Sequence, residues 1–346
     1  MKHVLARLGL VAAAILVALI LVEFGLRATR LDGQAMIRVL YYQGVLLNFH
    51  EAVEDPDLLF RLQPNTRDVI TPHTGRPCAF EVDKSGARGP QRPTIKPPGT
   101  TRVLFFGGST VFGAGVCDDE TITAHLERAL DRLRPGKHEV WNFGTSAYTG
   151  SQVIHRASLE LAQVQDSDLL VLLPTNVGRR PFLDGPEEQK LDFYRHFRTD
   201  PTLWLENFYV TQPWPGLSLR TTNQLHWGWL RWSALYRYTT LRTAPAERTN
   251  MVWNPYVASR ANDKATQLAV DAAERGVPVV YVLYPQPGSD EPGYQQRTYP
   301  FGEPWITLDR PGLEPEDRDL HPASERLDAH AQHLATLLIE GGFLEP

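Results

Sequence analysis

The chain has 346 residues, 42% hydrophobic and 22% charged, which is ordinary for a globular protein with a sizeable core. Its net charge is -5 at pH 7 and no long basic run occurs, which argues against nucleic acid as a partner. Neither a CxxC pair nor a Cys/His cluster accompanies its two cysteines, so the sequence does not indicate a zinc site.

Residues 1–30 have the features of a membrane segment. Lys2 and Arg7 precede a stretch from Leu8 to Leu26 whose one charged residue is Glu23, four positions before Arg27 and so able to pair with it. As a helix this stretch spans about 28 Å, close to the roughly 30 Å of bilayer hydrocarbon. No small-x-small cleavage site follows directly, so an uncleaved anchor is favoured over a cleaved signal peptide. Either interpretation places the rest of the chain on the periplasmic (extracytoplasmic) side of a cell membrane.

Residues 31–100 are predicted to form a stalk and an N-terminal extension. The second half of this region is rich in Pro, Gly and Thr, with an extended piece at Ala79–Asp83 and a turn at Lys84–Gly86. The run Pro97–Gly99 closes the extension and marks a domain boundary.

The two cysteines, Cys78 and Cys117, have two interpretations. In an oxidising compartment they can pair and close a loop of about 40 residues, which contributes about 3–4 kcal/mol in the chain-entropy treatment. They can equally be two buried free thiols, because the sequence does not give their separation.

Residues 101–346 alternate predicted strands and helices, which indicates an α/β domain with a parallel sheet covered on both faces. Strands are expected at Arg102–Phe106, Val140–Phe143, Asp168–Pro174 and Val277–Leu283, and helices at about 118–133, 151–164, 264–275 and 322–340. Asp118 and Asp119 can cap the first of these helices. Its apolar face consists of Ile122, Leu126, Ala129, Leu130 and Leu133, and that of the last helix of Leu327, Ala331, Leu334 and Leu338.

Residues 179–254 interrupt this alternation as an insertion that holds six of the eight tryptophans. Trp227, Trp229 and Trp232 lie among further aromatic residues and arginines. Such a segment can stack on carbohydrate, cover a site as a lid, or contact the membrane interface. The alternative is a helical subdomain that packs its tryptophans onto the sheet.

The most informative turn is at residues 103–115, where an apolar strand stops at Gly107-Gly108 and presents Ser109. A residue in this position lies at the carboxyl edge of an open α/β sheet, where ligands bind. Ser109 is therefore a candidate nucleophile. The alternative is that Ser109 or Thr110 only caps the following helix.

Further polar groups follow the ends of the next two strands. Gly144 and Asn176 can offer a backbone N–H and a side-chain amide, both typical donors to an oxyanion. Near the C-terminus Asp317 and Asp319 precede His321 by four and two residues, just before the last helix. A loop there can bring His321 to Ser109, with a carboxylate fixing its tautomer.

This ordered set resembles the blocks of the SGNH/GDSL hydrolase family, in particular its membrane-anchored bacterial branch. Residues 107–113 match the first block, Gly144 the second, Asn176 the third, and Asp319 with His321 the last. The segment Lys84–Pro90 is similar to a motif that precedes the catalytic domain in such proteins. The sequence departs from the family at Gly108, where many members have Asp, and at Pro174 and Val177 in the third block. It departs also at Arg318, where the acid commonly lies, so that Asp319 is the implied acid and Asp317 the alternative.

The resemblance implies a three-layer α/β/α, flavodoxin-like SGNH fold and a serine esterase that needs no metal or organic cofactor. Ser109 would attack an ester, His321 would transfer the proton, and Ser109, Gly144 and Asn176 would form the oxyanion hole. The expected partner is an ester-bearing small molecule or a cell-envelope glycan. Two alternatives remain open: an O-acyltransferase using the same residues, and a non-catalytic glycan-binding envelope protein.

Other candidate sites are weaker. His330 and His333 are spaced as in some metal sites, but no further ligand pattern accompanies them, so we predict a solvated helix face. His125 and His155 are also predicted on helix surfaces. The glycines near Ser109 do not give the dinucleotide-binding pattern GxGxxG.

Overall fold

The computed structural model describes residues 2–29, 31, 49–71, 75–133, 137–146, 148–163, 168–174, 177, 179–181, 233–243, 251–253, 255–283, 305–308 and 321–344. The chain divides into two compact units. The first comprises Met1–Asn48 and Phe182–Val252, and the second comprises Phe49–Pro181 and Trp253–Pro346.

The second unit is built on a five-stranded parallel sheet. Its strands are β5 (Thr101–Gly107), β6 (His138–Gly144), β7 (Leu169–Leu173), β10 (Val279–Leu283) and β11 (Trp305–Thr307). They lie side by side in the order β6-β5-β7-β10-β11, and every neighbouring pair is parallel. In chain order this is 2-1-3-4-5, the flavodoxin-like arrangement, in which the crevice falls between the first and third strands. The predicted α/β fold is confirmed.

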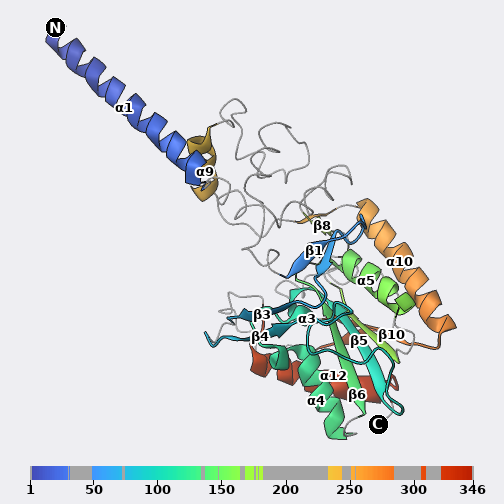
Figure 1. Ribbon diagram of the computed structural model, residues 1–346. Coiled ribbons are helices and arrows are strands. Elements are labelled where there is room, and N and C mark those ends of the chain that lie inside the picture. The colour runs from blue at the N-terminus through green and yellow to red at the C-terminus, as the bar shows by residue number, and fades with distance from the viewer. Residues whose placement is uncertain are drawn as a thin grey trace. The chain divides into compact units, whose positions relative to one another are not determined.

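Helices cover both faces of this sheet, which makes three layers. Helices α4 (Ile122–Leu133) and α12 (Ser324–Glu340) pack together on one face, and α5 (Gly150–Gln163) and α10 (Pro255–Glu274) on the other (Figure 1). Apolar residues at helical spacing fill the layer under α4 and α12, because each turn of these helices returns an aliphatic side chain to the sheet. This layer includes Val103, Phe105, Leu126, Leu130, Leu334 and Leu338.

Three details of the α4 region and of α12 differ from expectation. Leu133 is 57% exposed, because it lies in the last turn of α4, beyond the sheet that the other four residues of the face contact. Asp118 and Asp119 do not cap α4 but form a separate 3-10 turn, η1 (Asp118–Glu120). His330 of α12 is only 2% exposed, so this residue faces the interior rather than solvent.

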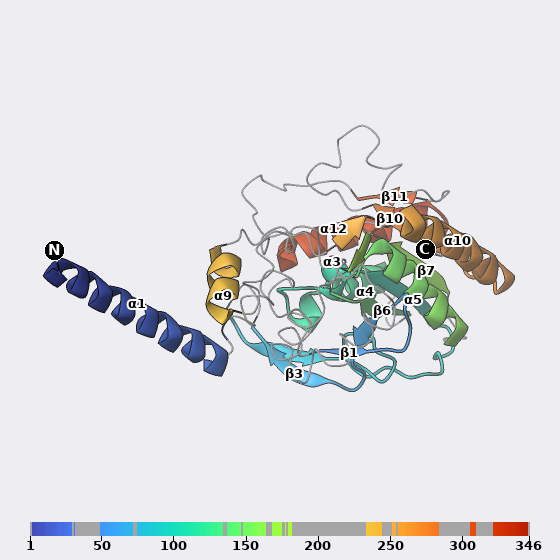
Figure 2. The ribbon, with the colours of Figure 1, turned by 90° about the horizontal axis from the view of Figure 1, so that it is seen from above.

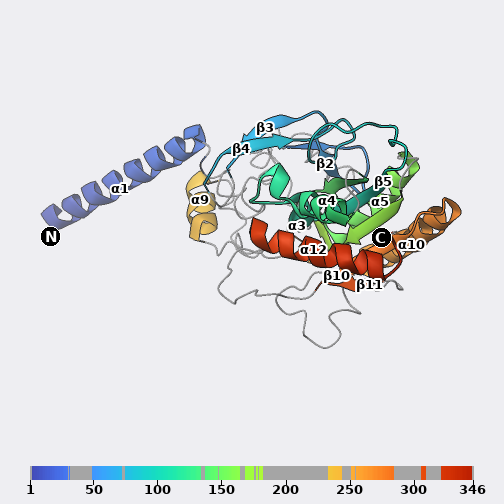
Figure 3. The ribbon, with the colours of Figure 1, turned by 90° about the horizontal axis from the view of Figure 1, so that it is seen from below.

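The extension contributes two hairpins to the second unit. Strand β1 (His50–Ala52) pairs with β2 (Phe60–Leu62), and β3 (Arg67–Ile70) with β4 (Cys78–Glu81), both antiparallel. They lie on the side of the sheet away from β11 (Figures 2 and 3). The backbone between β4 and β5 contacts the sheet directly, since the Arg88 N–H donates to the Asn142 carbonyl of β6 at 2.8 Å. The extension is therefore packed against the edge strand of the sheet.

The first unit contains α1 (Lys2–Thr29). Among the described residues, α1 is the one helix that is both long enough and apolar enough to cross a membrane. Glu23 and Arg27 form the expected ion pair, with 2.8 Å between Oε1 and Nε. A second helix, α9 (Ala234–Thr243), packs on α1 within this unit.

The predicted insertion begins at the short strand β8 (Arg179–Pro181), and the short strand β9 (Met251–Trp253) lies at its end. Of the six tryptophans in the insertion, Trp204, Trp214, Trp227, Trp229 and Trp232 lie outside the described residues.

Candidate active site

The carboxyl ends of three adjacent strands meet in register at one edge of the sheet. Gly107 at the end of β5 is paired with Gly144 of β6 on one side and with Leu173 of β7 on the other. Gly107 and Gly144, and Ser109 just after Gly107, therefore share one edge, as the order of the motifs predicts. Asn176 lies outside the described part of the chain.

Ser109 is the first residue of the short helix α3 (Ser109–Phe112), which follows β5 after Gly108. The side chain is half-buried, and in the described part of the chain its hydroxyl makes no hydrogen bond. Its carbonyl closes the turn by accepting the N–H groups of Gly113 and Ala114 at 2.9 and 3.0 Å. The N–H of a first helical residue has no acceptor within its own helix, so it can donate to a bound group.

Gly144 packs directly against α3. A Cβ atom at this position would overlap the backbone of Val111 and Phe112, so only glycine allows the strand end and α3 to approach this closely. Its N–H donates to the Oδ1 of Asn142 at 2.9 Å, and the Nδ2 of Asn142 donates to the Val111 carbonyl at 2.9 Å. An oxyanion would have to share the Gly144 N–H with Asn142.

His321 lies just before α12, and contacts of that helix fix the edge at which it starts. The Nε2 of His125, in the first turn of α4, is 3.1 Å from the Oγ of Ser324, and its Nδ1 is 3.1 Å from Asp328. Helix α4 follows β5 and η1 and so begins at the carboxyl edge of the sheet. Hence α12 begins there too, and half-buried His321 lies three residues before its start.

The two candidate acids, Asp317 and Asp319, lie outside the described residues. The structure therefore brings Ser109, Gly144 and His321 to one edge, and the catalytic roles assigned to these three residues, to the acids and to Asn176 all stay predictions.

His125 is not a solvated surface residue as expected. It is 8% exposed and lies between Arg128 and Asp328. Burial lowers the pKa of His125 and the charge of Arg128 lowers it further, against the opposing effect of Asp328. The neutral imidazole thus connects α4 with the start of α12.

The cysteines Cys78 and Cys117 form a disulfide, with 5.9 Å between their Cα atoms. Cys78 begins β4, and Cys117 precedes η1 in the loop that follows α3. The adjacent residue Asp118 reinforces the link, because its Oδ2 accepts the N–H of Glu81 at 2.8 Å. The loop after the candidate nucleophile is thereby fastened to the extension.

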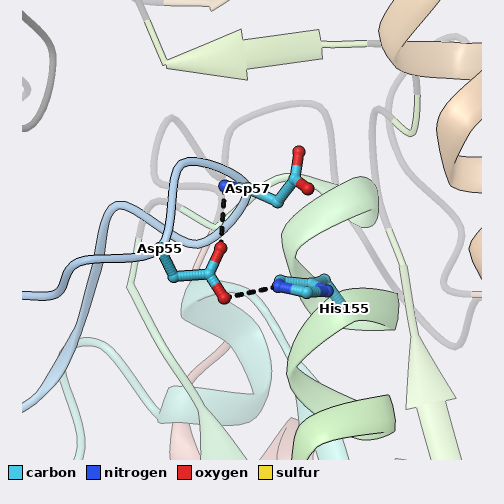
Figure 4. Close-up of side chains that lie close together, drawn as sticks. All are labelled: Asp55, Asp57 and His155. Carbon is cyan, nitrogen blue, oxygen red and sulfur yellow. Dashed lines mark hydrogen bonds and ion pairs between the residues drawn. The ribbon is translucent and has the colours of Figure 1, made fainter. Parts of the chain in front are cut away.

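A second polar cluster consists of Asp55, Asp57 and His155 (Figure 4). The Nε2 of His155 on α5 is 2.7 Å from the Oδ2 of Asp55, and the three side chains have the donor types that bind metal ions. However, the Nζ of Lys264 lies 2.7 Å from the Nδ1 of His155 and 2.8 Å from Asp57, and Arg260 also pairs with Asp57 at 2.6 Å. These cations already neutralise the carboxylates, so the donor set does not fit a metal site.

The same cluster shifts the acidity of both carboxyl groups. Burial alone would raise the pKa of Asp55, but the hydrogen bond and charge of His155 and the N–H groups of Asp57 and Leu58 lower it to about 2. Burial likewise opposes ionisation of Asp57, and Lys264 and Arg260 outweigh it, so the pKa of Asp57 is lowered. The cluster joins the extension to α5 and α10 as an ionised network.

Sequence reasoning missed two residues of this region. It assigned no role to Asn142, whose amide joins β6 to α3, or to Arg88, whose side chain is buried beside the same helix. These contacts join residues that are 31 and 24 positions apart in the sequence, so no local sequence pattern predicts them.

No protein-family model matches the sequence, and no curated protein matches it either. Among solved structures, the chain is similar to Est24, a carbohydrate acetylesterase from Sinorhizobium meliloti, with 12% sequence identity and a TM-score of 0.28. The match covers 70% of this chain and 99% of that chain. A likeness at this level does not carry an activity from one protein to the other.

Proposed function

We propose that the protein is a serine esterase of the SGNH/GDSL type, which hydrolyses ester-linked acyl groups of cell-envelope glycans. The observation that carries the proposal is the register of β5, β6 and β7, which aligns Gly107 with Gly144 and Leu173 directly before the turn that presents Ser109. The start of α12 at the same edge supports His321 as the proposed base.

The proposed chemistry proceeds through an acyl-enzyme. The Ser109 hydroxyl attacks the ester carbonyl while His321 takes its proton, and the same proton then passes to the leaving alcohol as the C–O bond breaks. Water attacks the acyl-enzyme with His321 again as base, releasing the carboxylic acid and restoring Ser109. Asp319, or Asp317 in its place, would hold the tautomer of His321.

The oxyanion donors in this proposal are the Ser109 N–H, the Gly144 N–H and the Asn176 amide. The Ser109 N–H starts a helix and has no acceptor there, which favours it as the first donor. The Gly144 N–H can contribute only as a bifurcated donor shared with Asn142. We infer that Ser109 and Asn176 bind the oxyanion more strongly than Gly144.

The proposed location is the extracytoplasmic side of a membrane, with α1 as anchor. The disulfide between Cys78 and Cys117 supports this side, because disulfides persist in oxidising compartments. An envelope glycan is the substrate that such an anchored esterase would meet. Water, rather than a sugar hydroxyl, is the acyl acceptor in this proposal.

Fluorophosphonate labelling of the full chain in detergent tests the nucleophile. We expect mass spectrometry to find the adduct on Ser109, and Ser109→Ala to lower hydrolysis of short acyl esters by about 10³-fold or more. Release of acetate from an O-acetylated envelope polysaccharide tests the substrate class.

Ser158→Ala is the matched control, since the Ser158 hydroxyl donates to the Ile154 carbonyl within α5 at 3.2 Å. This variant should keep the labelling and the activity of the wild type. An unlabelled wild type, or full activity in Ser109→Ala, would overturn the proposal.

A further inference from the structure

The side chain of Arg88 is buried between the extension and the region that follows the candidate nucleophile. The residue is 4% exposed, and its guanidinium carbon lies 5.0 Å from the ring centroid of Phe80 and 4.8 Å from that of Phe112. A cation between two aromatic faces is attracted by both rings. One of these rings belongs to α3, the helix that begins with Ser109.

The guanidinium group binds the end of α3 and the loop after it through every one of its nitrogens. Its NH1 donates to the carbonyls of Phe112 and Gly113, each at 2.7 Å, and its NH2 to the Val116 carbonyl at 2.7 Å. Its Nε donates to the Oδ1 of Asp118 at 2.7 Å. Carbonyls at the C-terminal end of a helix lack partners within the helix, and a cation stabilises them.

A buried arginine is retained only when its charge and donors are matched. Burial lowers the pKa of the Arg88 guanidinium, and the charge of Asp118 opposes that shift. The planar fork of arginine serves three carbonyls and one carboxylate at once, which the single ammonium of lysine cannot do. The described contacts therefore select arginine at this position.

We propose that Arg88 is a positioning residue for Ser109: by binding the Phe112, Gly113 and Val116 carbonyls, it fixes α3 and so the attack position of the Ser109 hydroxyl. This inference rests on the proposed function of Ser109. The extension then influences the reaction by holding α3 in place, although no atom of Arg88 has to touch the substrate.

Arg102 offers a matched control, because it lies near the amino end of β5, the strand whose carboxyl end leads to Ser109. It too is fully buried, and its guanidinium carbon lies 4.7 Å from the Trp141 ring. Its side chain pairs with Glu139 at 2.9 Å and donates to the Thr94 and Pro93 carbonyls at 2.9 and 3.0 Å. Arg102 thus has the same chemistry as Arg88, but at the amino end of β5, far along the strand from Ser109.

The experiment compares Arg88→Lys and Arg102→Lys in the full chain in detergent. We expect both variants to unfold at lower denaturant concentration. Only Arg88→Lys should slow fluorophosphonate labelling of Ser109 and lower kcat, by about 10- to 100-fold with KM nearly unchanged, because a small misplacement of the nucleophile acts on the chemical step. Asp118→Asn is the second variant, and we expect a smaller change in the same direction.

Amide hydrogen exchange supplies a readout that does not depend on activity. In the wild type the N–H groups of Phe112 and Gly113 donate to Gly108 and Ser109 at 2.9 Å. Their exchange should accelerate in Arg88→Lys and Asp118→Asn and stay at the wild-type rate in Arg102→Lys.

The outcomes separate the two proposals. Equal losses of labelling in Arg88→Lys and Arg102→Lys, or unchanged exchange at residues 112 and 113 in Arg88→Lys, would overturn the positioning role and leave the esterase proposal standing. An unlabelled wild type would overturn the esterase proposal, and the exchange rates would still decide whether Arg88 holds α3.

Discussion

Asn142 shows how a single side chain can hold the end of a strand against the helix that begins with Ser109. Its amide accepts the N–H of Gly144 and donates to the Val111 carbonyl, and the residue is 2% exposed. Both backbone groups are buried, so neither finds water when the amide is removed. The stability of this turn therefore depends on a residue that touches no reacting atom in the proposed chemistry.

We expect Asn142→Ala to lower the free energy of unfolding by about 2–4 kcal/mol, because it leaves a buried donor and a buried acceptor unsatisfied. Chemical denaturation of the full chain in detergent measures this loss. Gln267→Ala is the control, since the Gln267 amide pairs with Asp271 on the exposed face of α10, and its removal should change stability by less than about 0.5 kcal/mol. Equal denaturation midpoints for the two variants would contradict the assignment.

The ionised carboxyl of Asp55 makes stability depend on pH. Its pKa is about 2 in the folded chain, and an unfolded aspartate titrates near 3.9. A pKa that is lower in the folded state stabilises the fold above the unfolded value, and this contribution disappears as the pH falls through the folded value. The stabilising effect is thus present at pH 7 and is lost between about pH 4 and pH 2.

Asp55→Asn should accordingly be less stable than the wild type by on the order of 2 kcal/mol at pH 7, and the difference should shrink as the pH is lowered from 4 toward 2. Denaturation curves at pH 7, 4 and 3 measure it. Asp263→Asn, at an exposed position of α10, should differ little from the wild type at every pH. A difference between Asp55→Asn and the wild type that stays constant with pH would rule out the ionised network as its origin.

At the scale of elements, the N-terminus of α9 is completed by a residue of α1. The Glu23 carboxylate accepts the N–H groups of Ala234 and Leu235 at 2.8 and 2.9 Å and the hydroxyl of Ser233 at 2.8 Å. A carboxylate at this end satisfies donors that the helix leaves open and interacts favourably with its dipole. This contact explains why a charged residue stands in the otherwise uncharged stretch from Leu8 to Leu26 of α1.

We expect Glu23→Ala to destabilise the first turn of α9 by about 1–2 kcal/mol, as loss of a helix cap does. Hydrogen exchange of the amides at 234 and 235, in the full chain in nanodiscs, measures the effect as faster exchange. Thr29→Ala is a suitable control, since the Thr29 hydroxyl donates to the Gly25 carbonyl of α1 itself. If α9 exchanges equally in both variants, Glu23 does not cap it.

The elements that the sequence predicted best are those whose signal is local. The continuous apolar runs at 103–106 and 169–173 became the interior of two adjacent strands, because a strand buried on both faces needs apolar side chains at successive positions. Strand β11 was missed, since three residues with one partner strand carry no such pattern. Helix α10 begins at Pro255 rather than near Lys264. Its first turns were not predicted, because the sequence there lacks a regular apolar face.

Long-range contacts limited what could be predicted of the site. The order of Ser109, Gly144 and His321 predicted a shared sheet edge, since the carboxyl ends of parallel strands lie together. By contrast, Asp118 was expected to cap a helix and instead binds Arg88 and the N–H of Glu81, partners that its neighbours in the sequence do not reveal. His330 was expected in solvent because a polar residue on a helix is usually exposed, yet packing encloses it.

At the scale of the whole molecule, the boundary predicted at residue 100 separates two stretches of sequence that pack as one unit. Within that unit, the extension meets the sheet region through the buried Arg88, through Tyr148, whose hydroxyl donates to the Phe60 carbonyl at 2.5 Å, and through the disulfide. The residues before β5 thus stabilise the loop that follows Ser109. We therefore expect that weakening these contacts changes the reactivity of Ser109.

The disulfide gives the sharpest test of this coupling, because Cys78 and Cys117 are the only two cysteines of the chain. A bond that closes a loop of about 40 residues contributes about 3–4 kcal/mol in the chain-entropy treatment. We expect a thiol-free phosphine reductant, or the double change Cys78→Ser and Cys117→Ser, to lower the free energy of unfolding by that amount and to slow labelling of Ser109. The reductant should have no effect on the double variant, since it has no other bond to reduce. Unchanged stability of the wild type after complete reduction, verified by thiol titration, would show that the link does not hold the extension to the loop.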